Sequence, residues 1–458
     1  MTERRLAPAT VSAVPRPRQR LALAPTRRAA ILLAAGVIFL APAWIDRRAA
    51  LLILAWNAIV IGAMAADAER LPRGAALVVT RHWSGPLTIG SSVTLSLTLE
   101  NRSGHDVAAR LTDYLDAALR PEIESAAVRV PSRRSTTATY QVAPRDRGDL
   151  HAGEVLVEWR STWGLVERWA HADLAQEVRV YPDLHEGRRH SMYLIRSRQI
   201  ALQKRRARRA TGGREFDRLR EYRDGDDRRD VSWIVSARRA HLVTKVYQPE
   251  RSQTVWLLVD AGRLLRARSA GQTLLDRATT AAIALAQVAM TSGDNVGAIA
   301  YGRRIQHRLT PSRGPAQMRR IIEAMALTHA ESVEADHGGA AAALVEAQKR
   351  RALVVWLTDV AETAGVPDVI DHATTLVPRH VIVFATMRQP ELAETAGLAP
   401  RSKRDMFRML AAQEMLARRE ALLRGLRQRG ALIVEATPES LASGVVDRYL
   451  EVKERGLI

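Results

Sequence analysis

Two uncharged apolar segments near the N-terminus constrain the fold of this chain more than any other feature. Residues 29–45 and residues 49–66 carry no charged side chain, and only Asp46, Arg47 and Arg48 separate them. Each segment is about as long as a helix that crosses the hydrocarbon core of a bilayer, at the short end of the range. Because the connection is so short, two spanning helices here form a hairpin, and both outer ends of the hairpin lie on one side of the membrane.

Two other structures fit the same apolar segments. The first segment fits a cleavable signal peptide, but its charged leader is long and a second apolar segment follows almost at once. The pair also fits a helical hairpin buried in a soluble core. We favour two transmembrane helices, because each segment has the required length and neither carries a charge.

Basic residues predict the orientation of this hairpin. Several arginines precede the first segment, whereas the connection offers only two; those before the segment are Arg16, Arg18, Arg20, Arg27 and Arg28. The positive-inside rule therefore places the N-terminus, and everything after residue 66, in the cytoplasm. We expect a multi-pass protein of the inner (plasma) membrane whose soluble domains are cytoplasmic.

The chain has a formal net charge of +20, carried almost wholly by arginine. Three explanations fit this surplus: nucleic-acid binding, a cytoplasmic face against anionic lipid, or the composition bias of a GC-rich genome. The basic run at residues 204–209 has no interleaved aromatic residue, which favours a linker or a lipid-facing segment over a nucleic-acid site. The absence of cysteine excludes disulfides and thiol-ligated metals.

Short alternating strands follow the apolar segments and occupy residues 75–183. The strongest candidates are residues 77–79, 93–99, 138–142, 154–159 and 177–181, with glycine, asparagine and proline between them. Regular short strands separated by turn residues are typical of an antiparallel β-sandwich.

Strands and helices alternate from residue 251 to the end of the chain. The expected strands are residues 255–259, 296–301, 353–357, 380–385 and 432–435; the expected helices are residues 274–290, 316–327, 339–349, 403–428 and 439–453. Strands separated by helices of this length predict a mainly parallel sheet covered on both faces, an α/β fold.

A dense mixture of acids and arginines fills the segment between these two regions. Asp227 and Asp230 suit a helix start, and Val231, Ile234 and Val235 follow at helical spacing. We expect Trp233, beside this apolar stripe, to pack on a sheet. Because the acids alternate with arginines, their pKa values should be lowered, which disfavours acid catalysis. We pair Glu215, Asp226 and Asp230 with Arg220, Arg228 and Arg238.

This segment resembles the core motif of the bacterial domain of unknown function 58 family. The matching positions are Glu215, Phe216, Arg220, Glu221, Tyr222, Gly225, Asp226, Asp227, Arg228, Asp230, Val231, Trp233, Ala237 and Arg238. A weaker likeness extends to Arg145, Arg147 and Gly148, to residues 163–165 and to residues 180–182. There Trp163 departs from the phenylalanine of the family pattern.

The resemblance implies a fold and a partner. It implies that residues 251–458 form a von Willebrand factor type A-like domain with a doubly wound, mainly parallel sheet. It also implies a partnership with MoxR-type AAA+ ATPases, beside which members of the family are commonly encoded. The expected organisation is a basic leader (1–28), a transmembrane hairpin (29–66), the sandwich (75–183), a linker with the motif (184–250) and the type A-like domain (251–458).

Type A domains hold a divalent cation on an Asp-x-Ser-x-Ser strand end, a threonine and a second aspartate. Here Asp260 and Asp359 keep the carboxylates, but Gly262 and Leu264 replace both hydroxyls. Two carboxylates leave few ligands for magnesium, so we expect a degenerate site with weak binding or none, and no other cofactor. The same residues fit capping or ion-pairing roles, in which an arginine such as Arg263 neutralises them.

Motifs for catalysis are missing from the sequence. It has no phosphate-binding loop with Lys-Ser/Thr, no Gly-x-Ser-x-Gly elbow, no cysteine nucleophile and no His-Glu-x-x-His pair. This absence leads us to expect a membrane-anchored, non-enzymatic adaptor. The family resemblance implies that its cytoplasmic type A-like domain binds partner proteins, in a chaperone-like role with the ATPase. The alternative is an arginine-driven binder of nucleic acid or anionic lipid.

Overall fold

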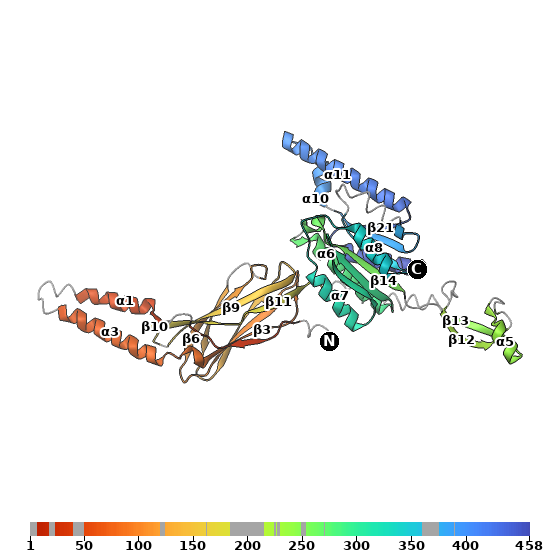
Figure 1. Ribbon diagram of the computed structural model, residues 1–458. Helices are drawn as coiled ribbons and strands as arrows, with labels where there is room; N and C mark the ends of the chain where they lie inside the picture. Colours follow the sequence, from red (N-terminus) through yellow and green to blue (C-terminus); the bar gives the residue numbers. More distant parts are fainter. Residues whose placement is uncertain are drawn as a thin grey trace. The chain divides into compact units, whose positions relative to one another are not determined.

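The computed structural model describes residues 7–17, 23–39, 50–119, 124–161, 163–183, 215–223, 226, 230–248, 253–269, 271–359, 375–388 and 390–458. They form two compact units, Met1–Tyr181 and Pro182–Ile458 (Figure 1). The fold is mixed α/β, with antiparallel and mixed sheets and an apolar helix near the N-terminus.

The first unit contains two sheets that enclose one apolar core. One sheet has the order β1-β3-β5-β8, with β1 (Val11–Ala13), β3 (Leu77–Trp83), β5 (Val93–Asn101) and β8 (Ser135–Val142). The other has the order β2-β10-β9-β11-β4, and β6 and β7 extend it beside β9; its strands are β2 (Leu23–Pro25), β4 (Leu87–Thr88), β6 (Val107–Leu115), β7 (Glu124–Val130), β9 (Gly148–Arg160), β10 (Val166–Ala172) and β11 (Gln176–Tyr181). Every second residue of β5 is buried, which is why this alternating sequence forms a half-buried strand.

Two of these strands come from the segment that we expected to be a basic leader. β1 pairs with β3, and β2 pairs with β10, both antiparallel. Arg16, between them, forms a backbone bridge with His171. Residues 11–13 and 23–25 of the expected leader therefore belong to the sandwich. The sequence pattern missed both strands because each has only three residues, too few to show an alternation.

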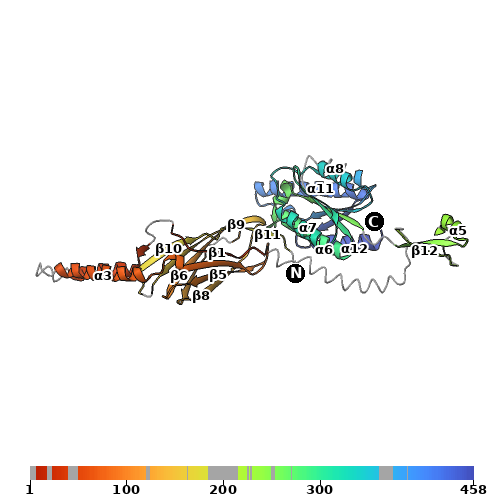
Figure 2. The same cartoon turned by 60° about the horizontal axis from the view of Figure 1, so that its bottom comes forward.

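A pair of helices leaves the sandwich after β2 and returns to it before β3 (Figures 1 and 2). The outgoing part is α1 (Arg27–Ala35) with the 3-10 helix η2 (Gly36–Phe39), and the returning helix is α3 (Ala50–Arg70). Trp56 joins them: its indole nitrogen donates to the Leu32 carbonyl at 2.8 Å, and its ring lies 5.9 Å from that of Phe39. Among the described residues, α3 is the one helix long and apolar enough to cross a membrane. The end of the predicted first span, residues 40–45, lies outside the described residues.

A buried carboxylate fixes this pair of helices to the sandwich. Asp67, in the last turn of α3, is fully buried and accepts hydrogen bonds from the Ser161 hydroxyl and from the backbone N–H groups of Leu165 (2.9 Å) and Val166 (3.1 Å). At the start of α1, the Thr26 hydroxyl donates to the Gly164 carbonyl at 2.6 Å. Both ends of the helix pair therefore meet the turn between β9 and β10.

A second buried charge crosses the sandwich core. Arg81 of β3 is fully buried and forms an ion pair with Asp113 of β6, which also accepts from the Tyr140 hydroxyl. The guanidinium donates further to the Leu174 and Gly153 carbonyls, at 2.9 and 2.8 Å. Because these groups come from both sheets, the network fixes one sheet against the other.

The second unit is built on a six-stranded sheet of order β18-β17-β14-β19-β20-β21. Its strands are β14 (Thr254–Asp260), β17 (Asn295–Tyr301), β18 (Ile305–Ser312), β19 (Leu353–Leu357), β20 (Val381–Met387) and β21 (Leu432–Ala436). Neighbouring strands are parallel except for β18, which runs antiparallel to β17 at the edge. The predicted mainly parallel sheet is confirmed. Its middle strands contain continuous apolar runs, as expected where helices cover both faces of a sheet.

Helices cover both faces of this sheet. α6 (Leu274–Thr291), α7 (Pro315–Leu327) and α12 (Leu441–Glu454) pack on one face; α8 (His337–Ala347) and α11 (Lys403–Gln428) pack on the other, and α10 (Pro390–Gly397) packs on α11 (Figure 1). A capping box at Thr273 and Asp276 starts α6.

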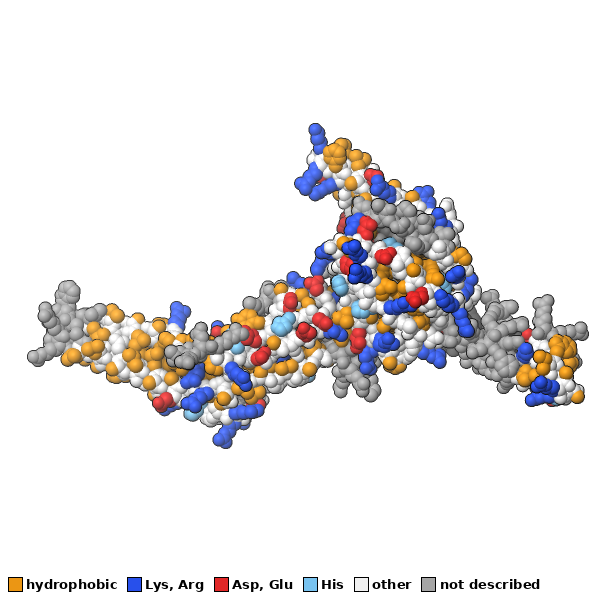
Figure 3. All heavy atoms as spheres, in the orientation of Figure 1, with side chains coloured by type: hydrophobic (Ala, Val, Ile, Leu, Met, Phe, Trp, Pro, Cys, Tyr) orange, Lys and Arg blue, Asp and Glu red, His pale blue; other side chains and the backbone are white. Residues whose placement is uncertain are grey.

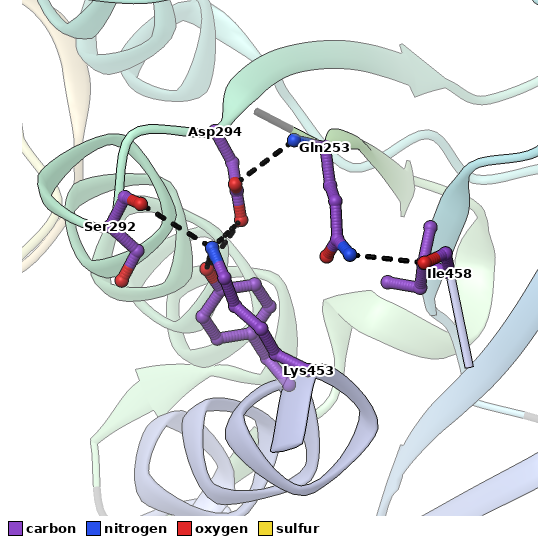
Figure 4. Close-up of polar contacts among 6 residues, drawn as sticks. Gln253, Ser292, Asp294, Lys453 and Ile458 are labelled. Carbon is purple, nitrogen blue, oxygen red and sulfur yellow. Dashed lines mark hydrogen bonds and ion pairs between the residues drawn. The ribbon is translucent and has the colours of Figure 1, made fainter. Parts of the chain in front are cut away.

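A polar cluster joins the beginning of this sheet to the C-terminal helix (Figure 4). The fully buried Asp294 accepts hydrogen bonds from the Gln253 backbone N–H (3.1 Å), the Tyr449 hydroxyl (2.6 Å) and the Lys453 ammonium (2.6 Å). The Gln253 side chain donates to the Ile458 carbonyl at 3.0 Å. The cluster therefore holds the residue that precedes β14 against the last helix.

We predict that Asp67→Ala destabilises the sandwich unit by about 3 kcal/mol, because the substitution leaves one hydroxyl and two backbone N–H groups buried without an acceptor. The measurement is chemical denaturation of the full chain in mild detergent, followed by tryptophan fluorescence. Glu69→Ala, an exposed neighbour on the same helix, is the control and should cost about 0.5 kcal/mol or less. Equal losses for the two variants would contradict the role of Asp67.

Candidate functional site

Polar side chains gather at the carboxyl edge of the six-stranded sheet. β14 ends in Asp260, Thr358 and Asp359 follow β19, and Thr386 lies near the end of β20. These strands are parallel neighbours in the sheet, so their carboxyl ends meet at one edge. In open α/β sheets this edge is where ligands bind. The sequence placed Asp260 and Asp359 together, and the structure does so.

Asp260 is held by its own loop and by the next strand. Its Oδ1 accepts from the Gly262 N–H at 2.7 Å, and its Oδ2 accepts from the Thr358 hydroxyl at 2.6 Å. Burial raises the pKa of Asp260, while nearby His337 and these two hydrogen bonds oppose the rise. A Cβ at position 262 would lie 2.9 Å from the Ala335 backbone nitrogen, so glycine allows the approach of that loop. One hydroxyl position of the type A pattern is therefore occupied by a residue needed for packing.

An arginine neutralises Asp359. Arg419, from the middle of α11, donates to Asp359 Oδ1 at 2.7 Å and also to the Thr386 hydroxyl. The Arg419 side chain is 8% exposed and that of Asp359 is fully buried, so the ion pair is shielded from water. A fixed cation therefore stands at the edge where type A domains hold a metal ion. The expectation of weak or no divalent-cation binding stays a prediction.

The arginine expected from the sequence has a different role. Arg263 forms an ion pair with Glu334, at 3.3 Å, on the surface. Arg419 lies in a helix with several arginine–glutamate pairs at i,i+4 spacing, such as Arg418 with Glu414, and nothing in the sequence distinguishes it from them. Only the fold reveals that it faces Asp359.

An aromatic cluster lies behind this edge. The Trp356 indole N–H donates to the Tyr301 hydroxyl, which lies 2.9 Å from His337 Nδ1. Because an indole N–H can only donate, the tyrosine oxygen is the acceptor of the Trp356 bond. Burial raises the pKa of Tyr301 well above its usual value, and the charge of Asp260 adds to the rise. These contacts and the raised pKa keep a neutral tyrosine in place.

The family motif forms a small ribbon with one short helix. β12 (Glu215–Glu221) pairs with β13 (Val243–Gln248), and α5 (Trp233–Arg239) lies between them in sequence. Arg220 forms an ion pair with Asp226 at 2.6 Å and holds the pKa of Asp226 below its usual range; the Arg223 backbone N–H contributes. Gly225, Asp227 and Arg228, and the side chains of Glu215 and Phe216, lie outside the described residues.

The predicted burial of Trp233 is wrong. Trp233 is 67% exposed and Ile234 is 73% exposed, whereas Val231 and Ser236 are buried against the ribbon. α5 has only seven residues, so a narrow face touches the ribbon and the rest of the helix points to solvent. Leu242, Ala237 and Arg238 are also exposed. The motif therefore presents an apolar surface with arginines beside it.

Comparison with known proteins supports the family resemblance. Residues 218–398 match the family described as Protein of unknown function DUF58. The uncharacterized protein YeaD of Bacillus subtilis (strain 168) is 30% identical over 133 residues, which are 28% of this chain and 32% of YeaD. The match thus spans about a third of the length of that curated relative.

Solved structures show weaker likeness. The conserved hypothetical protein BatB from Bacteroides thetaiotaomicron aligns with a TM-score of 0.32 and 12% identity over 44% of this chain and 100% of BatB. An aerotolerance-related membrane protein from Bacteroides fragilis NCTC 9343 aligns with a TM-score of 0.29 and 11% identity over 42% of this chain and 98% of that protein. Likeness at this level identifies neither a fold nor a function.

We predict that Arg419→Met destabilises the second unit by about 3–5 kcal/mol, because it leaves Asp359 as a buried charge without a partner. Adding Asp359→Leu to this variant should restore much of the loss, since the two side chains would then both be apolar. Arg418→Met, one residue away and on the surface, is the control and should cost at most about 1 kcal/mol. Chemical denaturation of the full chain measures all three variants. Similar losses at positions 418 and 419 would exclude a buried pair.

Proposed function

We propose that this protein is a membrane-anchored, non-enzymatic adaptor. It presents a partner-binding α/β domain at the cytoplasmic face of the membrane and acts together with a MoxR-type AAA+ ATPase. The observation that carries the proposal is the helix pair of the first unit. It exposes an apolar surface along its length, and both of its ends are fixed to one turn of the sandwich.

The exposed surface of the helix pair matches lipid better than water. Its large apolar side chains are 37–72% exposed: Ile31, Leu32, Val37, Ile38, Leu51, Leu52, Leu54, Ile59 and Ile61. They occur on both helices, so packing one helix on the other does not cover them. A continuous apolar surface of this kind marks a membrane or protein contact. The length of α3 and its lack of charge as far as Ala66 favour the membrane.

The strands on either side of the helix pair support an even number of membrane crossings. β2 precedes the pair and β3 follows it, and both belong to the sandwich. A soluble sandwich lies on one side of a membrane, so a chain that leaves it and returns crosses twice. Arg27 and Arg28 at the start of α1 favour the cytoplasm for that side, by the positive-inside rule.

For the second unit we propose a von Willebrand factor type A-like domain whose interactions do not require a metal. The strand order, with one antiparallel edge strand, and the two aspartates at neighbouring strand ends support this assignment. Arg419 supplies the positive charge that a cation provides in type A domains. The partner then binds through protein side chains, without a bridging metal.

The exposed face of the family motif is the proposed partner-binding surface. Trp233 and Ile234 project from α5, and Arg238 and Arg239 lie at the end of the same helix. Exposed tryptophan and arginine are the residue types most often found at binding hot spots. The partner follows from the family resemblance, which associates such proteins with MoxR-type ATPases.

We predict that Trp233→Ala weakens binding to the cognate ATPase by about 30-fold, which corresponds to a hot-spot loss of about 2 kcal/mol. Stability should change by about 0.5 kcal/mol or less, because the side chain is already exposed. Phe407→Ala is the matched control, since Phe407 of α11 is also 67% exposed, and it should leave binding unchanged. A pull-down and a thermal melt of each full-length variant test this. A destabilised Trp233→Ala chain, or one that binds normally, would refute the proposed surface.

A further inference from the structure

Three arginines and a tryptophan converge where the helix pair meets the sandwich; we call Arg28, Arg70, Arg160 and Trp163 the foot cluster. The Arg70 guanidinium carbon lies 4.1 Å from the centre of the Trp163 ring. Gly164 follows Trp163. A Cβ on Gly164 would lie 3.5 Å from Arg28 Nη1 and 4.0 Å from Arg160 Cδ. The guanidinium groups of Arg28 and Arg70 and the side chain of Arg160 thus lie around one short turn, and they come from α1, α3 and the end of β9.

These arginines have no carboxylate partner among the described residues. Arg28, Arg70 and Arg160 form no ion pair there, and neither do Arg27 and Arg73 beside them. Exposed arginines elsewhere in the chain often form ion pairs, as Arg179 does with Asp149. Asp67 lies close by, but its two oxygens accept from Ser161 and from backbone N–H groups. Within the described residues, the foot cluster therefore keeps positive charge that no salt bridge neutralises.

The same end of the sandwich carries further positive charge. Ala108 pairs with Arg160 on one side and with Arg129 on the other, so β7 and the turn after it lie at this end. Arg129, Arg133 and Arg134 are exposed there. The carboxylates near this end include Glu69, Glu100, Asp106, Glu158 and Glu167. Glu100 pairs with Arg102, Asp106 accepts from the Ser132 backbone N–H, and Glu167 lies opposite Arg160 in the register of β10 with β9. Arginine remains in excess.

The foot cluster also lies at the boundary of the apolar surface. The uncharged part of α3 ends at Ala66, and Arg70 follows about 6 Å further along the helix axis. Arg28 directly precedes the uncharged stretch of α1. When the apolar surface is in the hydrocarbon, the foot cluster stands at the depth of the lipid phosphates. Trp163 is 45% exposed, as tryptophans of interfacial belts are. Figure 3 shows the apolar helix pair with basic side chains where it joins the sandwich.

We propose that the foot cluster binds the phosphate of anionic phospholipids and so fixes the sandwich against the membrane surface. This inference rests on the proposed membrane anchoring. Guanidinium groups recognise phosphate through paired N–H donors, and the tryptophan contributes an amphipathic ring at the same depth. Near an anionic membrane, each basic residue contributes on the order of a fivefold gain in affinity.

The test is native mass spectrometry of the full chain in mild detergent, with phosphatidylglycerol or phosphatidylcholine of matched acyl chains. We expect the wild-type chain to retain phosphatidylglycerol at least about tenfold better. The variant Arg28→Gln/Arg70→Gln/Arg160→Gln should lose this preference, and the corresponding lysine variant should keep most of it, because the charge remains. The control Arg145→Gln/Arg147→Gln/Arg179→Gln changes the opposite end of the sandwich and should behave as wild type. Thermal melts establish that each variant is folded.

Two further outcomes separate this inference from the proposed function. Extraction of the wild-type chain from membranes by alkaline carbonate would refute the anchoring itself. A chain that stays in the membrane but shows equal retention of the two lipids, or an unchanged preference in the glutamine variant, would refute the foot cluster alone. If inorganic phosphate displaced phosphatidylglycerol completely, the foot cluster would be a phosphate-ion site without lipid specificity. That result would also overturn the inference.

Discussion

The structure of the first unit depends on strand pairing on both sides of one apolar segment. β1 and β2 enter the two sheets before the helix pair, and β3 continues the sandwich after it. The chain must therefore return to the end of the sandwich from which it left. Asp67 and Thr26 complete this constraint, because both bind the turn between β9 and β10. The apolar surface, the arginines at its foot and the side of the membrane on which the second unit is expected all follow from this return.

The two units use buried charge in the same way. In each, an arginine from one layer reaches an aspartate in another: Arg81 reaches Asp113 in the sandwich, and Arg419 reaches Asp359 in the α/β unit. Removing one partner of such a pair is costly, because the remaining charge stays buried. The pair at the carboxyl edge has a further consequence. It places a buried positive charge at the edge where ligands bind in open α/β sheets.

Much of this architecture could be predicted from the sequence, because it depends on periodic burial. Uncharged helical length, alternating strands and continuous apolar strands each leave a pattern that can be counted. Short or tertiary features do not. β1 and β2 have three residues each, Arg419 is one arginine among many on α11, and the seven-residue α5 is too short to bury Trp233. Arg220 and Asp226 form an ion pair within one compact motif, where the sequence grouped acids with arginines.

The most direct test of the account is to determine on which side of the membrane single introduced cysteines lie. The natural chain has no cysteine, so any labelling comes from the introduced residue. Cysteine is placed at Ser12 in β1, at Ser135 in β8 and at Glu414 in α11, one at a time, and a membrane-impermeant maleimide is applied to intact spheroplasts and to permeabilised ones. The account predicts that all three positions are labelled only after permeabilisation, because one hairpin returns the chain to the cytoplasmic side. Labelling of position 12 from one side and position 135 from the other would contradict the hairpin.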